Sequence, residues 1–467
     1  MYQRTLFIFR QDLRTHDNTA LIEAMKHSET VFPLFIHDTR AVEDFGLDDP
    51  RFGFIREALE SIDTKLQKYG GRLTVYQGRP DAIVEELIGQ YQIDAVFLNR
   101  SYSPRGKARD DAIMKHCDAQ EIDFHSFQDF LLIEPHEVEQ RKVFTPFSML
   151  WKKFLIAHPE RLIEQKFEWS NVRWFIPGDR REIGEVITVP YHQYWTLELS
   201  HERMERDFSH YDELRNIPWI DGSTRLSPYI RFGVYSVREI YRKFVPVILN
   251  AMKDPGNTKT LDSSVSPQND ETTLLSQTLL NELIWREFWY HIAYYFPFTY
   301  SLEFQERRRS IVWNTDETSY EWEMFQKWKT GYPLVDAAIK QLTRTNWMHN
   351  RLRMVVASFL TKNLGIDWRL GEKWFRKYLI DYDEAVNIGN WQWSASVWAD
   401  PKPVRIFNPL LQSEKFDPEA KFIKKYLPEL EDIDPKRIHT LELQGVYYPP
   451  IVDQKESARK AKERYRK

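Results

Sequence analysis

The first 130 residues alternate short apolar runs with amphipathic helical patterns, and this alternation constrains the fold more than any other feature of the chain. Continuous apolar strands separated by such helices indicate a parallel sheet that is covered on both faces. The pattern therefore predicts a doubly wound α/β domain over about residues 1–130. The expected strands lie at Thr5–Arg10, Val31–His37, Leu73–Tyr76 and Ala95–Leu98, and two of the expected helices lie at Phe54–Leu66 and Asp81–Tyr91.

The rest of the chain is predicted to form a connector followed by an all-α domain. Residues 131–200 contain scattered prolines and no sustained period, which is typical of a long interdomain connector. From residue 201 to residue 467 the helical period dominates. The stretch Ala251–Gln277 is an exception, because its Gly, Asn, Ser, Thr and Asp residues predict a mobile loop insertion. The clearest helices are expected at Thr278–Tyr295, Tyr332–Thr343 and Asn346–Leu360.

The composition narrows the class of protein. Cys117 is the only cysteine, so we expect neither a disulfide framework nor a thiolate metal site, and a reducing compartment suits the chain. The 13 histidines form no H-E-x-x-H pattern, and no metal is expected. Residues Met1–Arg10 lack signal-peptide features, and no apolar stretch is long enough to span a bilayer. These features predict a cytoplasmic protein in a bacterium or archaeon, or a nuclear protein in a eukaryote.

The chemistry is expected in the helical half, because the α/β part has no G-x-G-x-x-G motif after its first strand and no P-loop signature. Four residues fall at i, i+3, i+4 and i+7 on one helix face: Glu282, Trp285, Arg286 and Trp289. One interpretation is a salt-bridged surface helix with two partly covered tryptophans. The other is a wall of polar and aromatic groups that stacks on a flat ligand and hydrogen-bonds it.

Two further segments combine polar and aromatic side chains. In the first, Trp347, Asn350 and Met354 share a face by their helical spacing, and Arg351 and Arg353 flank that face. The second suits either a capped turn or another part of the same ligand site. It contains Asp381, Asp383, Asn387, Trp391 and Trp393.

Taken together, these segments resemble the photolyase/cryptochrome family, and the resemblance runs nearly from end to end of the chain. It is greatest to the class I photolyases that act on cyclobutane pyrimidine dimers, in which a Rossmann-like α/β domain precedes a helical FAD-binding domain. Chance does not readily produce several separate motifs in one order. The motifs are Arg10-Gln-Asp-Leu-Arg14-Thr-His-Asp-Asn18, Lys142-Val-Phe-Thr-Pro-Phe147, Gly222-Ser-Thr-Arg-Leu-Ser-Pro228, Trp328-Lys-Thr-Gly-Tyr-Pro333 with Val335-Asp336, Trp347–Met354 and Arg405-Ile-Phe-Asn-Pro409.

The resemblance implies an FAD that is folded in a U within the helical domain and is active in its reduced anionic form. Arg353 and Asp381 would form an ion pair across the flavin. Asn387 would face the redox-active flavin nitrogen, where plant cryptochromes carry Asp and many animal ones carry Cys. The implied cofactor-binding residues are Tyr211, Ser223, Thr224, Arg225, Leu226, Ser227, Arg286, Trp347, Arg353, Asp381, Asp383 and Asn387.

The resemblance also implies light-driven DNA repair. An electron passes from excited reduced FAD to a flipped-out pyrimidine dimer, the cyclobutane ring opens, and the electron returns. Glu282, Asn350, Met354 and Asn387 would be the catalytic set, with Glu282 stabilising the dimer radical anion. Photolyases for the (6-4) lesion usually carry His where Asn350 and Met354 stand. The implied substrate-binding residues are Glu282, Trp285, Asn350, Arg351, Met354 and Trp393.

A chain of tryptophans normally carries electrons to the flavin in this family. Trp391 and Trp368 match its first two members, and Trp313 is the expected outer member, although Trp322 could also serve. The implied partner is damaged DNA, bound by a monomer with no obligate protein partner and no membrane attachment.

A second, light-harvesting chromophore is implied in the α/β domain. The stretch Tyr102–Lys107, with Arg109 and Asp110, is more similar to the deazaflavin or flavin type of site than to the folate type, and the identity of the chromophore stays open.

Several positions depart from the family pattern and keep other functions open. Leu279 stands where several photolyases have Trp, Trp328 and Trp398 stand where Gly is common, and the turn Asn387–Asn390 differs from the usual Asn-Asn-Gly. These departures predict an altered pocket rim. The alternative function is a cryptochrome-type blue-light sensor without repair activity. A third is a flavoprotein that only shuttles electrons or binds nucleic acid without repair.

Overall fold

A computed structural model describes residues 1–46, 48–244, 271–399 and 404–466. The chain forms two compact units. Unit 1 comprises residues 1–140, 146–207 and 225–294, and unit 2 comprises residues 141–145, 208–224 and 295–467. Each unit is therefore built from separate stretches of the chain. The division at residues 130 and 200 stays a prediction from the sequence.

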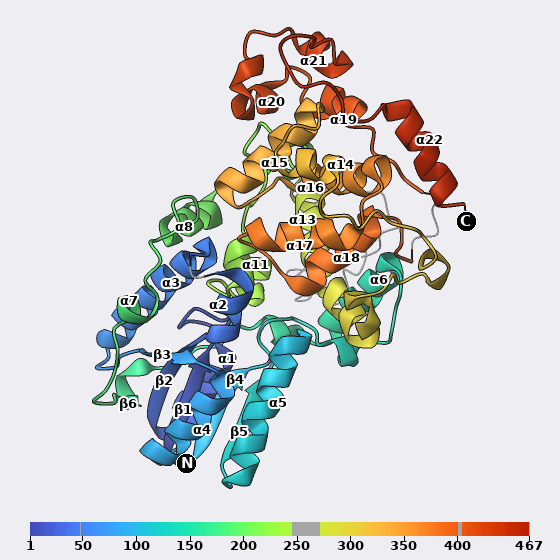
Figure 1. Ribbon diagram of the computed structural model, residues 1–467. Coiled ribbons are helices and arrows are strands. Elements are labelled where there is room, and N and C mark those ends of the chain that lie inside the picture. The colour runs from blue at the N-terminus through green and yellow to red at the C-terminus, as the bar shows by residue number, and fades with distance from the viewer. Residues whose placement is uncertain (47, 245–270, 400–403, 467) are drawn as a thin grey trace. The chain divides into compact units, whose positions relative to one another are not determined.

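Unit 1 contains the predicted parallel sheet (Figure 1). Its strands follow the order β3-β2-β1-β4-β5, and β6 pairs with β2 outside this path. Every pairing is parallel, so the predicted fold class is confirmed. The sequence did not reveal β5, because its residues DFHSF form no continuous apolar run. The strands are β1 (Tyr2–Phe9), β2 (Ser28–Asp38), β3 (Thr74–Gly78), β4 (Ala95–Asn99), β5 (Asp123–Phe127) and β6 (Arg173–Trp174).

The period-two geometry of the strands divides their apolar side chains between the two faces of the sheet. Leu6 and Ile8 of β1 belong to one buried cluster together with residues of α4 and α5, including Val84 and Ile113. Helices therefore cover a sheet that is apolar on both sides. The helices that lie wholly or almost wholly in unit 1 are α1 (Thr19–His27), α2 (Thr39–Phe45), α3 (Pro50–Gln67), α4 (Pro80–Tyr91), α5 (Pro104–Ala119), α6 (Phe144–Ala157), α7 (Ile183–Val186), α8 (Leu197–Glu205), α10 (Ser227–Arg231), α11 (Val237–Phe244) and α13 (Glu271–Tyr295).

Two expectations about irregular segments are corrected. The predicted connector contains the 14-residue helix α6, whose apolar residues are too continuous to show a helical stripe in the sequence. The predicted loop Ala251–Gln277 is wrong from residue 271 onward, because Glu271–Gln277 form the first turns of α13. Helix formation extends readily from an existing helix, even through polar residues. Residues 251–270 lie outside the described part of the chain.

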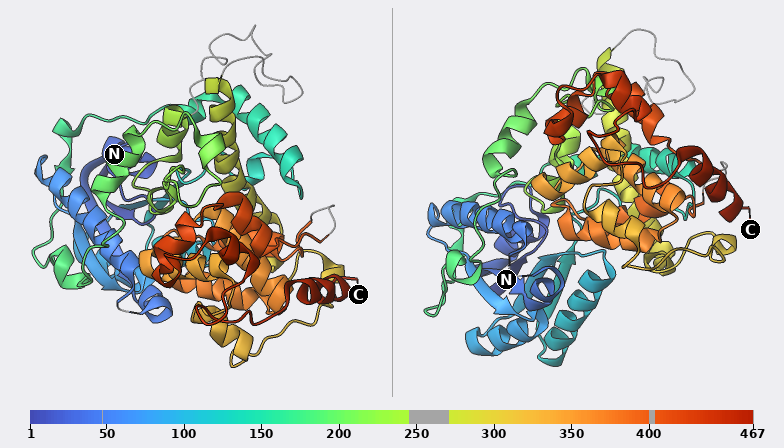
Figure 2. Two further views of the ribbon diagram at one scale, coloured as in Figure 1. Left: turned by 90° about the horizontal axis from the view of Figure 1, so that it is seen from above. Right: turned by 45° about the horizontal axis from the view of Figure 1, so that its top comes forward.

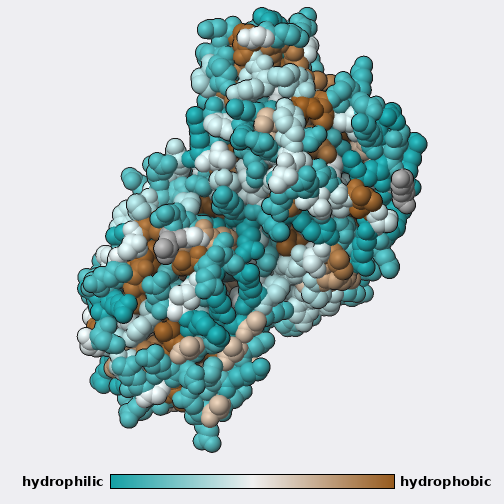
Figure 3. Space-filling model, in the orientation of Figure 1, coloured by the Kyte–Doolittle hydropathy of each residue, from teal (hydrophilic) through white to brown (hydrophobic). Residues whose placement is uncertain are grey.

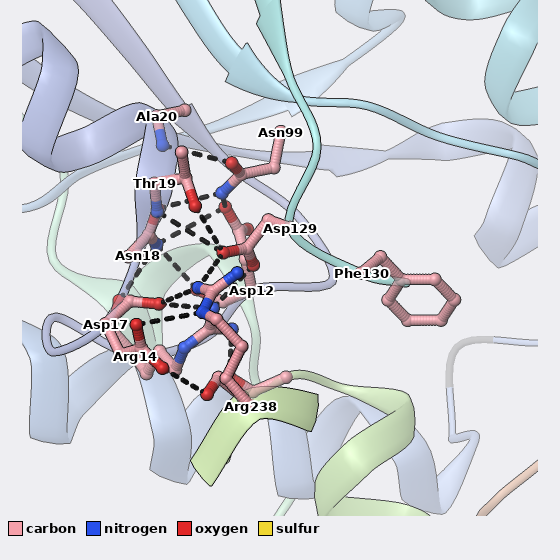
Figure 4. Close-up of polar contacts among 12 residues, drawn as sticks. Asp12, Arg14, Asp17, Asn18, Thr19, Ala20, Asn99, Asp129, Phe130 and Arg238 are labelled. Carbon is pink, nitrogen blue, oxygen red and sulfur yellow. Dashed lines mark hydrogen bonds and ion pairs between the residues drawn. The ribbon is translucent and has the colours of Figure 1, made fainter. Parts of the chain in front are cut away.

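The motif Arg10–Asn18 folds into a buried ionic network in unit 1 (Figure 4). Asp129 accepts hydrogen bonds from Arg14 Nη2 at 2.5 Å and from Arg238 Nη2 at 2.7 Å. Burial by itself raises the pKa of Asp129, but the two arginines outweigh it and lower the pKa to about 2. Arg238 also pairs with Asp17 at 3.0 Å. The network therefore joins the segments after β1 and β5 to helix α11.

A glycine is needed at position 233, where the backbone before α11 comes close to the backbone of Gln11 and Asp12. Its φ is +67°, and a Cβ atom there would lie 2.1 Å from the Gln11 carbonyl oxygen. The carbonyl oxygen of Gly233 accepts a hydrogen bond from Arg14 Nη1 at 3.1 Å. A side chain at this position would force the backbone away from the network.

Unit 2 is helical (Figure 1 and Figure 2). Helix α15 is buried over ten of its residues and packs against α16, α19 and α20. Between α16 and α17 lies a π-helical segment, Phe359–Leu364. The helices of unit 2 are α9 (Tyr211–Leu214), α14 (Tyr320–Gln326), α15 (Pro333–Thr345), α16 (Asn350–Ser358), α17 (Trp368–Tyr378), α18 (Glu384–Ser394), α19 (Pro409–Phe416), α20 (Lys421–Tyr426), α21 (Pro435–Thr440) and α22 (Gln454–Arg464).

Among the described helices, none combines the length and the apolar character that crossing a bilayer requires. On the face drawn in Figure 3, hydrophobic residues are scattered among hydrophilic ones.

Asp129→Asn should lower the free energy of unfolding by about 3–5 kcal/mol, because it leaves two buried guanidinium groups without their shared charge. Urea unfolding of the purified protein would measure the loss. Asp118→Asn, on the exposed end of α5, is the matched control and should stay within about 0.5 kcal/mol of the unchanged protein. Equal stabilities for the two variants would contradict the importance of the network.

Candidate active site

The predicted site residues are divided between the two units. Unit 1 carries Arg225, Leu226, Ser227, Glu282, Trp285 and Arg286. Unit 2 carries Tyr211, Ser223, Thr224, Trp313, Trp347, Asn350, Arg351, Arg353, Met354, Trp368, Asp381, Asp383, Asn387, Trp391 and Trp393.

The helix face predicted from Glu282 to Trp289 lies on α13, and its character changes along the helix. Glu282, Trp285 and Arg286 are half-buried. Trp289 is buried and packs on Trp285, with ring centroids 5.6 Å apart, and on Phe288. The first turn of this face is therefore the part that can reach a ligand, and Trp289 belongs to the core.

Arg286 is held by the segment that follows the ionic network. Its Nη1 donates to the Phe130 carbonyl oxygen at 3.0 Å, and its guanidinium carbon lies 4.0 Å from the centre of the Phe130 ring. Its Nη2 is buried and has no hydrogen-bond partner among the described residues. A half-buried guanidinium whose Nη2 donor is buried and unused fits a ligand that supplies oxygen atoms, such as FAD.

Glu287 is a buried residue that the sequence did not single out. Its carboxylate accepts hydrogen bonds from the Leu132 and Ile133 backbone N–H groups and from Trp151 Nε1 at 2.6 Å. Burial raises the pKa of Glu287 to about 7, against these hydrogen bonds, which lower it. Glu287 thus fastens α13 to α6 and to residues 132–133. Only its place beside Arg286 could have drawn attention to it.

In unit 2 the expected helix Asn346–Leu360 begins later than predicted. Asn346 has a left-handed conformation with φ 56° and ends α15. His349 caps the next helix, α16, by accepting a hydrogen bond from the Arg351 N–H. Trp347 therefore lies in the turn before the helix, so the prediction that it shares a helix face with Asn350 and Met354 is wrong.

The Arg353–Asp381 ion pair is present in unit 2. Arg353 Nη2 lies 2.8 Å from one carboxylate oxygen of Asp381 and 3.1 Å from the other. Arg353 Nε also donates to the Met348 carbonyl oxygen at 2.8 Å, which fixes the guanidinium plane. The Asp381 side chain is 3% exposed and the Arg353 side chain is 26% exposed, so the carboxylate of this ion pair is buried and its guanidinium is half-buried.

Asn387 lies on α18, one turn after the cap of that helix. Asp383 caps α18 by accepting a hydrogen bond from the Val386 N–H at 3.3 Å. Asn387 Nδ2 donates to Glu372 Oε1 at 3.1 Å, and Tyr382 donates its hydroxyl hydrogen to the same oxygen at 3.0 Å. Burial raises the pKa of Glu372. The amide of Asn387 is thus oriented by a buried carboxyl group.

A basic and aromatic pocket in unit 2 includes Trp393. The half-buried Trp393 ring lies beside Arg405, whose guanidinium carbon is 5.6 Å from the ring centre. Lys362 is buried in the pocket wall, and burial lowers its pKa to about 7. Its ammonium donates to the Ser394 carbonyl oxygen at 2.6 Å. The pocket is lined by Gln305, Arg307, Arg308, Lys362, Trp393, Ser394, Ser396, Trp398, Val404, Arg405 and Phe407.

The departures from the family pattern have structural explanations in two places. Trp398 lines the pocket but is buried, and its ring packs on Phe304 with centroids 4.3 Å apart. Trp328 has φ 55°, a left-handed conformation that glycine adopts without strain, and Lys340 lies 4.4 Å from its ring centre. Leu279 is buried in unit 1.

Trp391 and Trp368 both belong to the core formed by α17 and α18. Trp391 packs on Phe375, with centroids 4.9 Å apart. A Cβ atom at Gly371 would lie 2.2 Å from the Trp391 ring, so glycine permits this close approach. Trp368 stands one turn before Gly371 in the same helix and is 1% exposed. In the described part of the chain, no group of three or more His, Cys, Asp and Glu residues could hold a metal ion.

Comparison with known proteins decides the family. The model described as DNA photolyase matches residues 5–164, and the model described as the FAD binding domain of DNA photolyase matches residues 279–467. The chain belongs to the DNA photolyase family. Members of this family are lyases and flavoproteins, and the helical part of this photolyase is accordingly an FAD-binding domain.

The similarity extends over nearly the full length of the relatives. The chain is 34% identical to a deoxyribodipyrimidine photo-lyase of Alkalihalophilus pseudofirmus, covering 97% of this chain and 96% of that protein. It is 32% identical to the enzyme of the same name from Synechococcus sp., covering 96% and 93%. Among solved structures, a class III photolyase of Agrobacterium tumefaciens has a TM-score of 0.84 at 30% identity, covering 100% and 98%. An archaeal photolyase of Sulfolobus tokodaii has a TM-score of 0.83 at 30% identity, covering 99% and 100%.

Glu287→Gln should remove a pH dependence of stability. Because the folded pKa is raised from 4.5 to about 7, protonated Glu287 contributes stability below pH 4.5 that is lost as the pH rises through 7. The loss is roughly 3 kcal/mol at most. Thermal unfolding of the photolyase and of the variant between pH 4.5 and 8 would show it. Parallel pH profiles for the two proteins would be the contrary result.

Proposed function

We propose that this photolyase repairs cyclobutane pyrimidine dimers in DNA with light, in the manner of the class I enzymes. The observation that carries the proposal is the full-length similarity to proteins named deoxyribodipyrimidine photo-lyase. Glu282 on α13 and Asn387 on α18, the two positions at which sensors of the family tend to differ, support the same function.

The chain's own residues would hold the cofactor and orient it. When bound in its reduced form, FAD supplies the electron that light makes available. Arg286 offers a buried donor, and the Arg353–Asp381 pair offers a fixed donor and acceptor. Asn387, oriented by Glu372, would present its amide to the flavin. Tyr211 and the residues Ser223–Ser227 would contact the pyrophosphate, and Trp347 and Asp383 would complete the cofactor site.

The substrate would be a dimer flipped out of the helix, since its lost stacking lowers the cost of extrusion. Trp285 and Trp393, both half-buried, offer flat faces to the damaged bases. Glu282 would hydrogen-bond the bases and stabilise the negative charge that they acquire. Asn350, Arg351 and Met354, from the first turns of α16, would also bind the substrate. Phosphate contacts would make binding salt-dependent.

A light-and-dark comparison tests the proposal directly. The photolyase is purified, its flavin is chemically reduced, and an oligonucleotide with one cyclobutane thymine dimer is added. We expect base absorbance to be restored under blue light and not in the dark. A protein that binds and photoreduces its flavin but restores no absorbance would instead act as a light sensor, as in cryptochromes.

Glu282→Ala should lower the repair yield much more than it lowers lesion binding. Its contact strengthens as the dimer becomes anionic, so it contributes more to the charged intermediate than to the bound ground state. We expect a loss of about tenfold or more in repair per absorbed photon, the scale of one hydrogen bond to a charged group, and less than about threefold in binding. Glu202→Ala, on the exposed surface of α8, is the matched control. Equal losses in repair and binding would remove Glu282 from its assigned role.

We propose that the α/β part holds a second chromophore of the flavin or deazaflavin type. The Sulfolobus tokodaii photolyase, similar over its whole length, is described with two FAD molecules, with the implication of a novel light-harvesting cofactor. In this chain Tyr102 donates its hydroxyl hydrogen to Glu134 at 2.6 Å, and Lys107 lies 4.5 Å from the Tyr294 ring centre. Burial and the nearby Arg10 lower the pKa of Arg109 to about 10. These groups make a partly buried aromatic and cationic surface at the start of α5.

Mass spectrometry of the chromophores released from the natively purified photolyase tests this second site. We expect one FAD per chain and one further flavin or deazaflavin. Lys107→Ala should reduce the amount of the second chromophore and leave the FAD content unchanged. A released folate, or FAD alone at one per chain, would contradict the assignment.

A further inference from the structure

A single carboxylate in unit 2 joins two of the tryptophans assigned to electron transfer. Glu303 Oε1 accepts hydrogen bonds from Trp368 Nε1 and from Trp313 Nε1, each at 3.2 Å. The Glu303 side chain is only 5% exposed, whereas Trp313 is partly exposed. The buried tryptophan and the tryptophan near the surface are thus bridged by one negatively charged atom.

Glu303 is ionised in the folded protein. Burial by itself raises its pKa, but the hydrogen bond and charge of Arg369, together with the Trp368 N–H, outweigh burial and hold the pKa below its ordinary value. Arg369 Nη2 lies 2.9 Å from Glu303 Oε2, the oxygen that does not touch the indoles. The negative charge is therefore present at neutral pH and lies against both indole N–H groups.

Simple packing does not account for this arrangement. The ion pair with Arg369 would satisfy one oxygen of Glu303, and an indole N–H needs only a neutral acceptor such as a carbonyl oxygen. Here both N–H groups share one charged oxygen. Loss of an electron from either ring creates a positive charge at hydrogen-bond distance from that oxygen, and such a charge is strongly stabilised where water is scarce.

We propose that Glu303 is a positioning residue for electron transfer, which stabilises the radical cations of Trp368 and Trp313 and draws the positive charge outward. This inference rests on the proposed function, because it takes Trp391, Trp368 and Trp313 as the chain that feeds the flavin. It also selects Trp313 over Trp322 as the outer member. Trp322 is buried and stacks on Phe325, with centroids 5.6 Å apart.

Arg369 gives the transfer its direction. Its guanidinium carbon lies 4.6 Å from the centre of the Trp368 ring, so a positive charge on that ring is opposed by a second positive charge. No cationic side chain of the described residues lies over the Trp313 ring. Glu303 stabilises a positive charge on either ring, but Arg369 opposes a positive charge on the Trp368 ring alone. The positive charge is therefore more stable on Trp313.

The electron balance is simple. Oxidised FAD, when bound and excited by light, would supply the acceptor for one electron from the inner tryptophans, which would leave Trp368 one electron short. One electron then passes from the Trp313 ring to the Trp368 ring, and no bond is made or broken. Both Nε1–H protons stay on their nitrogens. A thiol reductant in solution finally returns one electron to Trp313.

Glu303→Gln removes the charge and keeps the size of the side chain and an oxygen that can accept a hydrogen bond. Flash absorption after blue light, on the protein with oxidised FAD, follows the tryptophan radical cation. We expect its lifetime to fall by about tenfold, the scale of one hydrogen bond to a charged group. Glu306→Gln removes a charge from the exposed part of the same segment and is the matched control, with an unchanged lifetime. Glu303→Asp keeps the charge and should recover most of the lifetime.

A second measurement avoids the flavin. Pulse radiolysis with azide radicals oxidises tryptophans in the dark, and we expect Glu303→Gln to lower the share of radical at Trp313, identified as the signal lost in Trp313→Phe. Unchanged lifetime and unchanged radical share in Glu303→Gln would overturn the proposal, as would a Glu306→Gln effect of the same size.

Failure of this inference and failure of the proposed function are distinguishable. Chemically reduced Glu303→Gln should repair dimers as well as the unchanged photolyase, because repair from reduced FAD does not use the electron-transfer chain of Trp391, Trp368 and Trp313. If the unchanged, reduced protein repairs no dimers while its tryptophan signals respond to Glu303→Gln, the repair function is wrong and the role of Glu303 stands.

Discussion

The structure of unit 1 depends on the buried charge of Asp129. Two guanidinium groups, from Arg14 near the start of the chain and from Arg238 on α11, converge on this one carboxylate. All three side chains are almost fully buried, so each charge is compensated mainly by the opposite charges beside it and not by water. The carboxylate also accepts a hydrogen bond from the Thr19 hydroxyl at the start of α1. One ionic contact therefore fixes where the sheet, its first helix and a distant helical segment meet.

The residues that follow Asp129 in the chain hold helix α13 in place. The next residue, Phe130, holds Arg286 through its carbonyl oxygen and its ring, and two residues further on the backbone N–H groups of Leu132 and Ile133 bind Glu287. Helix α13 is thus fastened at two adjacent positions by one short segment. Glu282 stands about one turn before these positions on α13, and Trp285 directly precedes them. The orientation of the Glu282 and Trp285 side chains therefore depends on polar contacts with residues 130–133, which follow strand β5. The contact of Glu287 with residues 132–133 involves no residue of the family motifs.

The parts that the sequence predicted are those whose signal is local. The apolar strands β1, β2, β3 and β4 and the helices α3, α4 and α15 were predicted from their apolar runs and periods. The Arg353–Asp381 pair was expected only from the family resemblance. Helix α6 was not predicted, because its own apolar residues occur on most of its faces and its sequence shows no single apolar stripe. The start of α16 was placed too early, since only the left-handed Asn346 and the capping His349 mark it. The partners of Glu287, and Trp368 and Arg369 among the partners of Glu303, lie far away in the sequence, and no local pattern reveals such contacts.

Neither unit is continuous in sequence, and this has a consequence for the order in which the chain emerges from a ribosome. The strands of the sheet are complete once β5 and the two-residue β6 have been made, but Arg238, Arg286 and Glu287 are translated much later. Until then Arg14 and Asp129 can pair with each other but not with Arg238, and the backbone N–H groups of residues 132–133 lack the carboxylate of Glu287. The segment 208–224, which belongs to unit 2, is made before unit 1 is finished. The nascent sheet therefore lacks some of these contacts while more than a hundred further residues are synthesised. Chaperone binding would be of most use during this period.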